Sequence, residues 1–270
     1  MQSPALRFTK MHGLGNDFVV IDTIQQKVDW RSLPLKQIAD RHLGIGCDQI
    51  LLIESSKNAD VFCRIINADG SEAEQCGNGL RCVARFINEK GLLTRANVTI
   101  ETIAGIFPVE IKDYDHIRVT IATVGIDAAA MQLQLPELDT AVSGSALSMG
   151  NPHFIIKVDD IVTAPAAQVG EAVATHPSFP HGTNVGFMQV MNNKHIRLRT
   201  YERGAGETNA CGSNACAAVA AGILDGSLQH TVMVEFKYGQ LLIEWEGKGK
   251  PVHMTGPAIS VFEGEVKSVK

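Results

Sequence analysis

The chain has 270 residues, 45% hydrophobic and 20% charged, which is a composition typical of globular proteins and long enough for one large domain or two ordinary ones. The net charge of −5 comes without a run of like charges, which argues against a nucleic-acid partner. No stretch is long and apolar enough to span a bilayer, and the first ten residues lack the apolar region of a secretory signal. We therefore expect a cytoplasmic protein without membrane contact, whose six cysteines stay reduced.

In the first half of the chain, alternation of apolar and polar residues predicts a series of strands. They are Phe18–Asp22, Gln49–Glu54, Val61–Asn67, Val98–Glu101, Ile106–Ile111 and Ile117–Ile121. One helix is predicted among them, because Leu80, Val83, Ala84 and Ile87 follow helical spacing. A polar, turn-rich stretch from Val124 to Ser148 is the expected domain boundary.

The second half repeats this style. Strands are predicted at Phe154–Val158, Val185–Val190, His195–Tyr201, Thr231–Lys237 and Gln240–Glu244. A helix is predicted where Ala215, Ala218, Val219 and Gly222 recur at helical spacing, and its small residues imply close packing on all sides. The sequence thus favours a mixed α/β (α+β) protein of two similar halves.

An internal duplication with an offset of 135 residues supports two halves. The chemically capable residues that match at this offset are Gly15-Asn16 with Gly150-Asn151, Gln49 with Asn184, Arg64 with Arg199, Asn67 with Glu202, Glu72 with Glu207, and Cys76-Gly77 with Cys211-Gly212. The identities alone are little above chance, so the argument depends on their clustering at polar residues. A coincidence of common residues is the alternative.

Two cysteines stand directly before the predicted helices. Cys76 is followed by Gly77-Asn78 and Cys211 by Gly212-Ser213, so each thiol is expected at a helix N-terminus. There the helix dipole and free N–H groups favour a thiolate, and we expect the pKa of each thiol to move from about 8.5 towards neutrality. The same N–H groups form an anion site that suits a carboxylate.

Two thiols flanking one carbon suit the removal of a proton from one face and its delivery to the other. This is racemisation or epimerisation next to a carboxylate, in which N–H donors stabilise the charge that develops. We find no lysine motif for pyridoxal phosphate and no glycine-rich nucleotide loop, so the reaction is expected to need no cofactor.

Other interpretations of the cysteines remain open. Cys47, Cys63, Cys82 and Cys216 lie within strand or helix patterns and are expected to be buried small hydrophobes. The spacings around Cys76 and Cys211 do not match structural zinc sites, so no metal is expected. A redox pair is possible, as an oxidised form of the same site.

Further polar residues are ambiguous one by one. Asn16 suits a turn, His153 a satisfied buried histidine, and Glu202-Arg203 a surface ion pair. Taken together with Asn67, Asn151 and Asn184, however, they fit a second amino-acid-like group at the far end of a substrate.

In these residues the sequence resembles the diaminopimelate epimerase family. The matching stretches run in order through nearly the whole chain: Met11–Phe18, Asn67–Ser71, Cys76–Gly79, Met149–His153, Gly182–Asn184, Tyr201–Thr208 and Ala210–Ser213. The resemblance implies interconversion of LL- and meso-2,6-diaminopimelate, on the route to lysine and to cell-wall peptide, without a cofactor. It also implies a homodimer.

The resemblance further implies two similar α/β domains, each a mostly antiparallel sheet around a central helix, related by a pseudo-twofold axis and closing over an interdomain cleft that holds the active site. The expected ranges are 1–122 with 257–270, carrying Cys76, and 123–256, carrying Cys211. Both cysteines would be catalytic, and His153 and Glu202 would tune them. The implied substrate-binding residues are Asn16, Gln49, Asn67, Gly77, Asn78, Asn151, Asn184, Glu202, Arg203, Gly212 and Ser213.

Two residues depart from the family pattern. Asn214 stands where glycine is common and is expected to alter only the first turn of its helix, and Phe262 stands where some members have a tyrosine linked to the dimer contact. The nearest rival function is a proline or hydroxyproline racemase, which would need a compact apolar pocket instead of amides with Glu202 and Arg203. A non-catalytic thiol-redox or amino-acid-binding protein is the rival from another class.

Overall fold

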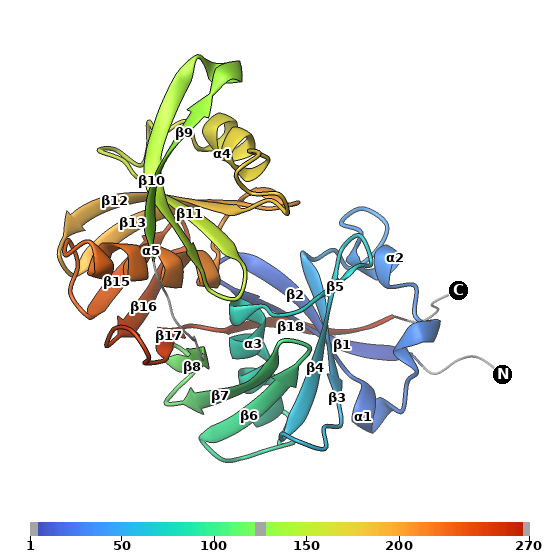
Figure 1. The fold of residues 1–270 in the computed structure, drawn as a ribbon. Coiled ribbons are helices and arrows are strands. Elements are labelled where there is room, and N and C mark those ends of the chain that lie inside the picture. Colours follow the sequence, from blue (N-terminus) through green and yellow to red (C-terminus); the bar gives the residue numbers. More distant parts are fainter. Residues whose placement is uncertain (1–4, 122–127, 267–270) are drawn as a thin grey trace. The chain divides into compact units, whose positions relative to one another are not determined.

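A computed structural model describes residues 5–121 and 128–266 of the chain (Figure 1). The chain forms two compact units, Met1–Val119 with Gly256–Lys270, and Thr120–Thr255. The boundary between the units lies within strand β8, Ile117–Ile121. The predicted boundary between residues 122 and 123 lies outside the described residues, so the predicted domain ranges stay predictions.

The first unit is a mostly antiparallel sheet whose strands lie side by side in the order β18, β1, β2, β3, β4, β6, β7, β8. Only the β2–β3 and β4–β6 pairs among these are parallel. A short strand, β5, pairs with β4. The strands are β1 (Leu6–Gly13), β2 (Asn16–Asp22), β3 (Gln49–Glu54), β4 (Val61–Asn67), β5 (Glu72–Ala73), β6 (Asn97–Thr102), β7 (Gly105–Ile111), β8 and β18 (Ile259–Val266).

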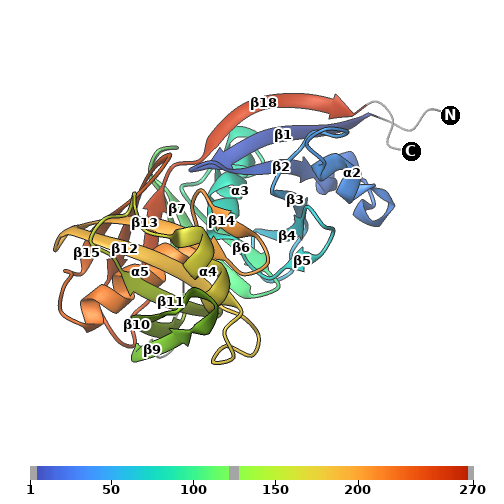
Figure 2. The ribbon, with the colours of Figure 1, turned by 90° about the horizontal axis from the view of Figure 1, so that it is seen from above.

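Helix α3, Gly77–Glu89, packs against β1, β2, β3, β6, β7 and β18 of this sheet (Figure 2). Its residues Leu80, Val83, Ala84 and Ile87, predicted from their spacing, are fully buried. Because sheet strands surround the helix, the apolar stripe finds a partner on several sides. The short helices α1 (Thr23–Gln26), η1 (Trp30–Ser32) and α2 (Leu35–Ala39) lie in the β2–β3 connection.

The second unit has strands in the order β9, β10, β11, β12, β13, β15, β16, β17, with β14 paired to β13. They are β9 (Ala129–Leu135), β10 (Thr140–Ser148), β11 (Pro152–Lys157), β12 (Asn184–Asn192), β13 (His195–Glu202), β14 (Gly206–Thr208), β15 (Thr231–Phe236), β16 (Gly239–Trp245) and β17 (Val252–Gly256). The helical segments are η2 (Pro136–Leu138), α4 (Ala166–Ala174) and α5 (Gly212–Leu224).

Helix α5 packs against β10, β11, β12 and β16 and is buried along almost its whole length. A Cβ atom placed on Gly222 would lie only 2.3 Å from Cδ1 of Leu228, so no larger residue fits there. The close packing on all sides that the alanines and glycines predict is confirmed.

The internal duplication is also confirmed, because the two units repeat one strand order. In the first unit the antiparallel pair β1–β2 is followed by the parallel pair β2–β3, the antiparallel pairs β3–β4 and β4–β5, helix α3, the parallel pair β4–β6 and the antiparallel strands β6, β7 and β8. In the second unit the corresponding pairs are β10–β11, β11–β12, β12–β13 and β13–β14, followed by helix α5, the parallel pair β13–β15 and the antiparallel strands β15, β16 and β17. Helices α3 and α5 begin 135 residues apart, at Gly77 and Gly212. The predicted mixed α/β class with two similar halves is therefore correct.

One prediction about local structure is wrong, and one helix was missed. The stretch Val124–Ser148 is not a turn-rich boundary, because its described part forms the hairpin β9–β10. The alternation there was hidden by small and polar residues, since one face of the hairpin is largely exposed. Helix α4 was not predicted, although its apolar residues bury a face against β12 and β13.

Among the described residues, no helix has the length and apolar character needed to cross a membrane.

Candidate functional site

Cys76 occupies the N-cap position of helix α3. Its backbone is extended, with φ −145° and ψ 107°, and its sulfur accepts a hydrogen bond from the Gly79 N–H across 3.4 Å. The thiol is partly exposed, whereas Cys63 and Cys82 on neighbouring elements are fully buried. The predicted placement of this cysteine at a helix N-terminus is therefore confirmed.

The amide of Asn16 lies beside this sulfur. Its Oδ1 is 3.6 Å from Cys76 Sγ and 3.2 Å from Nδ2 of Asn78, which is the second residue of α3. Asn16 begins β2 directly after the turn at Leu14 and Gly15, both of which have positive φ (56° and 84°). This tight turn between β1 and β2 brings the amide to the helix N-terminus.

Gln49 and Asn67 face each other on β3 and β4. Nε2 of Gln49 donates to Oδ1 of Asn67 across 2.8 Å, and Nδ2 of Asn67 donates to the Ser71 hydroxyl across 2.9 Å. Oε1 of Gln49 is buried and has no hydrogen-bond partner among the described residues. A buried acceptor left in this state is costly unless a ligand satisfies it.

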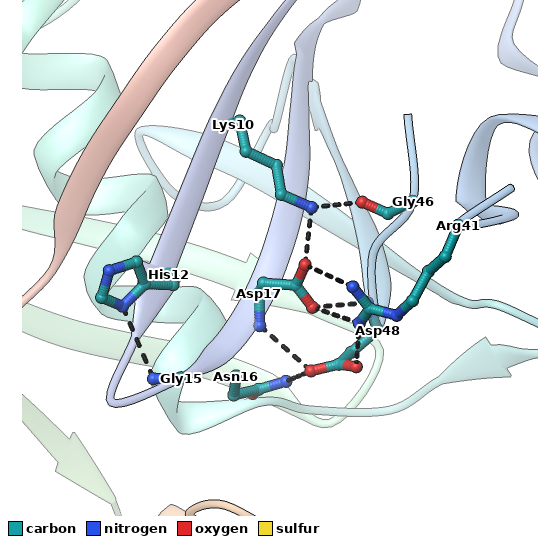
Figure 3. Close-up of polar contacts among 8 residues, drawn as sticks. All are labelled: Lys10, His12, Gly15, Asn16, Asp17, Arg41, Gly46 and Asp48. Atoms are coloured by element: carbon teal, nitrogen blue, oxygen red, sulfur yellow. Dashed lines mark hydrogen bonds and ion pairs between the residues drawn. The ribbon is translucent and has the colours of Figure 1, made fainter. Parts of the chain in front are cut away.

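A network of charged side chains that the sequence analysis missed lies next to Asn16 (Figure 3). Arg41 binds the Asp17 carboxylate through both terminal nitrogens, at 3.0 and 2.7 Å, and also donates to Asp48 across 2.7 Å. Asp48 in turn accepts from Nδ2 of Asn16 across 2.9 Å and from the Asp17 N–H across 3.0 Å. No sequence pattern signals this network, because its members meet only when β2 pairs with β3.

Cys211 is the N-cap residue of α5 in the second unit, as predicted. It is buried, its sulfur lies 3.4 Å from the Ser213 hydroxyl, and its thiol hydrogen-bonds to the Glu202 carboxylate. Burial raises the pKa of the Cys211 thiol well above its usual value, and the Glu202 charge and hydrogen bond add to this. The expectation that the pKa of this thiol moves towards neutrality is therefore wrong, because burial and Glu202 raise the pKa more than the Ser213 hydroxyl and the Asn214 N–H lower it.

Glu202 ends strand β13 and Arg203 directly follows it, and both are held by local contacts. The Glu202 Oε1 atom accepts from the Thr208 hydroxyl across 2.5 Å. The Arg203 N–H donates to Oδ1 of Asn184 across 3.0 Å, and its guanidinium donates to the His181 carbonyl across 2.8 Å. Asn184 opposes His153 in the parallel pair of β11 and β12, so these side chains share one end of the sheet.

His153 is fully buried between two amides. Its Nδ1 lies 3.3 Å from Oδ1 of Asn214, and its Nε2 lies 2.9 Å from the amide of Asn151. Burial lowers the pKa of His153 to about 4, so the imidazole is neutral at physiological pH. Asn214 also donates to the Val185 carbonyl across 2.9 Å, and this fully buried residue does more than alter the first helical turn.

The matched pairs Arg64/Glu72 and Arg199/Glu207 form ion pairs within their own units. Each joins a long strand, β4 or β13, to the short strand that comes next along the chain, β5 or β14, just before the cysteine. They therefore support the cysteine loops and are not free to bind a substrate.

The predicted site residues thus gather in two sets, one in each unit. The first set, here called half-site 1, comprises Asn16, Gln49, Asn67, Cys76, Gly77 and Asn78. The second, half-site 2, comprises Asn151, His153, Asn184, Glu202, Arg203, Cys211, Gly212 and Ser213. Each offers a thiol, the N–H groups of a helix terminus and side-chain amides, which suits an anionic substrate and proton transfer.

Comparisons of the sequence with known proteins agree on one family. The sequence profile described as diaminopimelate epimerase matches residues 8–126 and 145–261. A diaminopimelate epimerase of Nitrosospira multiformis is 47% identical over 272 residues, covering 97% of this chain and 98% of that protein. One from Azoarcus sp. (strain BH72) is 49% identical over 275 residues, covering 97% and 99%.

Solved structures with low identity share the fold. A phenazine biosynthesis protein of the PhzF family from Bacillus anthracis is 18% identical, with a TM-score of 0.75 over 98% of this chain and 99% of that one. A hydroxyproline epimerase from Agrobacterium vitis, with bound trans-4-hydroxy-L-proline, is 16% identical, with a TM-score of 0.73 over 100% and 95%. With a matching profile along most of its length and relatives near half identity, this chain belongs to the diaminopimelate epimerase family.

Proposed function

We propose that the chain interconverts LL- and meso-2,6-diaminopimelate by two-base proton transfer, with Cys76 and Cys211 acting on opposite faces of one α-carbon. The reaction is that of its family, an isomerisation in lysine biosynthesis. The observation that carries the assignment of the two residues is their equivalent position, since each cysteine is the N-cap of the buried helix of its unit.

The proton balance of this reaction closes on the two cysteines when one starts as a thiolate and the other as a thiol. One cysteine, as thiolate, takes the α-proton, and the electron pair is delocalised into the neighbouring carboxylate. The other cysteine, as thiol, delivers its proton to the opposite face, and the two groups have then exchanged protonation states. The reverse reaction uses the same groups in exchanged roles, which explains a duplicated site.

The helix termini supply the anion site that the reaction requires. The N–H groups of Gly77 and Asn78 in α3, and of Gly212 and Ser213 in α5, are among the first in their helices and lack intrahelical acceptors. N–H donors directed at the substrate carboxylate stabilise the charge that builds up on it, and the glycine after each cysteine lets the backbone approach closely.

Glu202 and His153 support the tuning role expected for them. The Glu202 carboxylate accepts the hydrogen bond of the Cys211 thiol, so it is placed to receive the proton when Cys211 must become a base. In the free enzyme the raised pKa of Cys211 keeps this residue a thiol, ready to act as the acid. His153 orients Asn151 as a neutral imidazole.

The remaining amides suit the second amino-acid end of the substrate. Gln49 holds an unsatisfied buried oxygen that accepts from an ammonium, and Asn67, Asn184 and Arg203 are fixed by hydrogen bonds. Proline has no second polar end to satisfy these groups, which argues against a proline racemase.

Incubation with diaminopimelate in heavy water under reducing conditions tests the proposal. We expect deuterium at the α-carbon, measured by mass spectrometry, together with interconversion of the stereoisomers, measured by chromatography. Proline and trans-4-hydroxyproline are the substrate controls and should exchange no α-proton. Exchange with proline and none with diaminopimelate would reverse the assignment.

We propose in addition that the protein is a cytoplasmic homodimer. None of the six cysteines forms a disulfide bond in the described residues, as in a reducing compartment. Val261 and Phe262 on β18 are 53% and 50% exposed, which offers apolar surface for a second copy. Sedimentation of the purified protein should give twice the mass of the chain, and a Phe262→Glu variant should sediment as a monomer.

A further inference from the structure

A continuous chain of hydrogen bonds runs through half-site 1 from Arg81 to Asp48. Nη2 of Arg81 donates to Oδ1 of Asn78 across 2.7 Å, and Nδ2 of Asn78 donates to Oδ1 of Asn16 across 3.2 Å. Nδ2 of Asn16 then donates to Oδ2 of Asp48 across 2.9 Å. Two amides are thus linked between a cation and an anion.

The two ends of this chain fix its direction. A guanidinium group can only donate hydrogen bonds, and a carboxylate can only accept them. Arg81 therefore holds the oxygen of the Asn78 amide towards itself, and Asp48 holds the nitrogen of the Asn16 amide towards itself. Because the middle bond needs one donor and one acceptor, neither amide can turn over without breaking a hydrogen bond to a charged group.

The orientation of the Asn16 amide decides which of its atoms faces the Cys76 sulfur. The oxygen of the Asn16 amide, which faces away from Asp48, lies 3.6 Å from the Cys76 sulfur and can only accept from it. The S–H bond is therefore directed at Asn16, while the Gly79 N–H donates to the same sulfur from the helix. A reversed Asn16 amide would instead present an N–H group and favour the thiolate.

Arg81 and Asp48, the two ends of this series of hydrogen bonds, are each held in place by further contacts. Arg81 is fully buried, and its Nε donates to the Pro257 carbonyl across 3.1 Å. Asp48 is held by Arg41, whose guanidinium also binds Asp17 through two nitrogens (Figure 3). The Arg41 and Lys10 cations hold the pKa of Asp17 well below its usual range, so Asp17 stays charged and keeps Arg41 beside Asp48.

We infer that Asp48 and Arg81 are positioning residues that lock the Asn16 amide with its oxygen towards Cys76 and so direct the S–H bond of this cysteine at Asn16 whenever it is protonated. This inference rests on the proposed function, in which Cys76 must serve as an acid in one direction of the reaction. The Gly79 N–H donates to the same sulfur, so the sulfur is also stabilised when it becomes a thiolate.

Cys76 is to be alkylated at pH values above neutrality. In that range the titratable groups named below, which lie around this series of hydrogen bonds, do not change charge. Burial raises the pKa of Cys63 and, to about 12, that of Cys82, so both remain thiols. Burial lowers the pKa of His12, which is therefore neutral, and Asp17 and Arg41 keep their charges.

The pH dependence of Cys76 alkylation tests the lock without any substrate. The full-length protein is treated with iodoacetamide over a range of pH, and modification of the Cys76 peptide is followed by mass spectrometry. Asp48→Ala and Asp48→Asn remove the same negative charge, but only the asparagine keeps an acceptor oxygen for Asn16. Asp60→Ala is the matched control, since Asp60 belongs to the same unit and bonds to Thr99 and Arg95 instead.

We expect the alkylation midpoint of Asp48→Ala to fall by about one pH unit, which corresponds to about 1.4 kcal/mol, because the hydrogen bond from Asn16 then changes from favouring the thiol to favouring the thiolate. Asp48→Asn and Asp60→Ala should keep the wild-type midpoint. Equal shifts in Asp48→Asn and Asp48→Ala would reduce the effect to charge and overturn the inference. An unchanged midpoint in Asp48→Ala would overturn it too.

Epimerisation by the same variants separates this inference from the proposed function. Asp48→Ala should lower kcat/KM for diaminopimelate about tenfold and Asp48→Asn less than about threefold, with Asp60→Ala unchanged. If the wild-type protein does not turn over diaminopimelate while the midpoints behave as expected, the proposed function fails and the lock stands. If turnover is normal in Asp48→Ala, the lock has no role in the reaction.

Discussion

The Gly79 N–H donates to the sulfur of Cys76 across 3.4 Å, so one residue is both the N-cap of α3 and the proposed acid–base group of half-site 1. An N-cap satisfies an N–H group that the helix itself leaves without an acceptor. Structure and chemistry therefore depend on the same atom, and substitutions can separate the two.

Cys76→Ala should lower the rate of epimerisation about 10²–10⁴-fold. It should also lower the free energy of unfolding by about 0.5–1 kcal/mol through loss of the cap. Cys76→Ser is the matched control. Its hydroxyl caps the helix but is a far weaker acid than a thiol, so stability should be kept while turnover is lost. Urea unfolding and a stereoisomer assay measure the two effects. Full activity in either variant would exclude Cys76 as a base.

Alkylation should distinguish Cys76 from the buried cysteines. Burial raises the pKa of Cys47 to about 11 and that of Cys82 to about 12, and both side chains are inaccessible. At pH 8 iodoacetamide should therefore modify Cys76 first, as peptide mass spectrometry would show. Diaminopimelate should slow this reaction and proline should not. Early modification of Cys82 would contradict the burial that the structure gives it.

Much of the strand pattern could be predicted because regular strands alternate. Strands β3 and β4 occupy the predicted ranges Gln49–Glu54 and Val61–Asn67. Strand β1 was missed because its pairing with β18 shifts register between Lys10 and Met11, which interrupts the alternation. Helix α4 was missed because Gly170 interrupts its pattern. The glycine is needed there for packing, since a Cβ atom at this position would lie 2.6 Å from Tyr201.

The cysteine loops could be predicted because their signal is local. Each consists of a cysteine, a glycine and a helix pattern, and the offset of 135 residues relates the two. Asp48 could not be found in this way, since it contacts Asn16 from 32 residues away through the pairing of β2 with β3. The raised pKa of Cys211 was equally hidden, because burial follows from tertiary packing and not from the first turn of a helix.

The free energy of unfolding should depend on pH through His153. Its pKa is about 4 in the folded protein and about 6.5 in an unfolded chain, so the unfolded chain binds the extra proton between these values. Stability should therefore fall as the pH drops from 6.5 to 4, by up to about 3 kcal/mol. His153→Gln should flatten this part of the curve, as urea unfolding at each pH would measure. His116→Gln, at an exposed position, should leave it unchanged.

Gly186 leaves room for the Asn214 side chain that contacts His153. A Cβ atom at position 186 would lie 2.8 Å from both Oδ1 of Asn214 and Cδ1 of Ile155. Asn214 cannot withdraw, because it is fully buried and bonded to His153 and to the Val185 carbonyl. Gly186→Ala should therefore destabilise the protein by about 1–3 kcal/mol and reduce turnover.

Two double variants separate these effects of Gly186→Ala. Adding Ile155→Val removes one of the two close contacts, so thermal unfolding should show partial recovery of stability while turnover stays low. Adding Asn214→Gly removes the other contact but also the partner of His153, so stability should again recover in part and turnover should not. Recovery of turnover in the Asn214→Gly background would mean that His153 orients Asn151 without an amide partner at Nδ1.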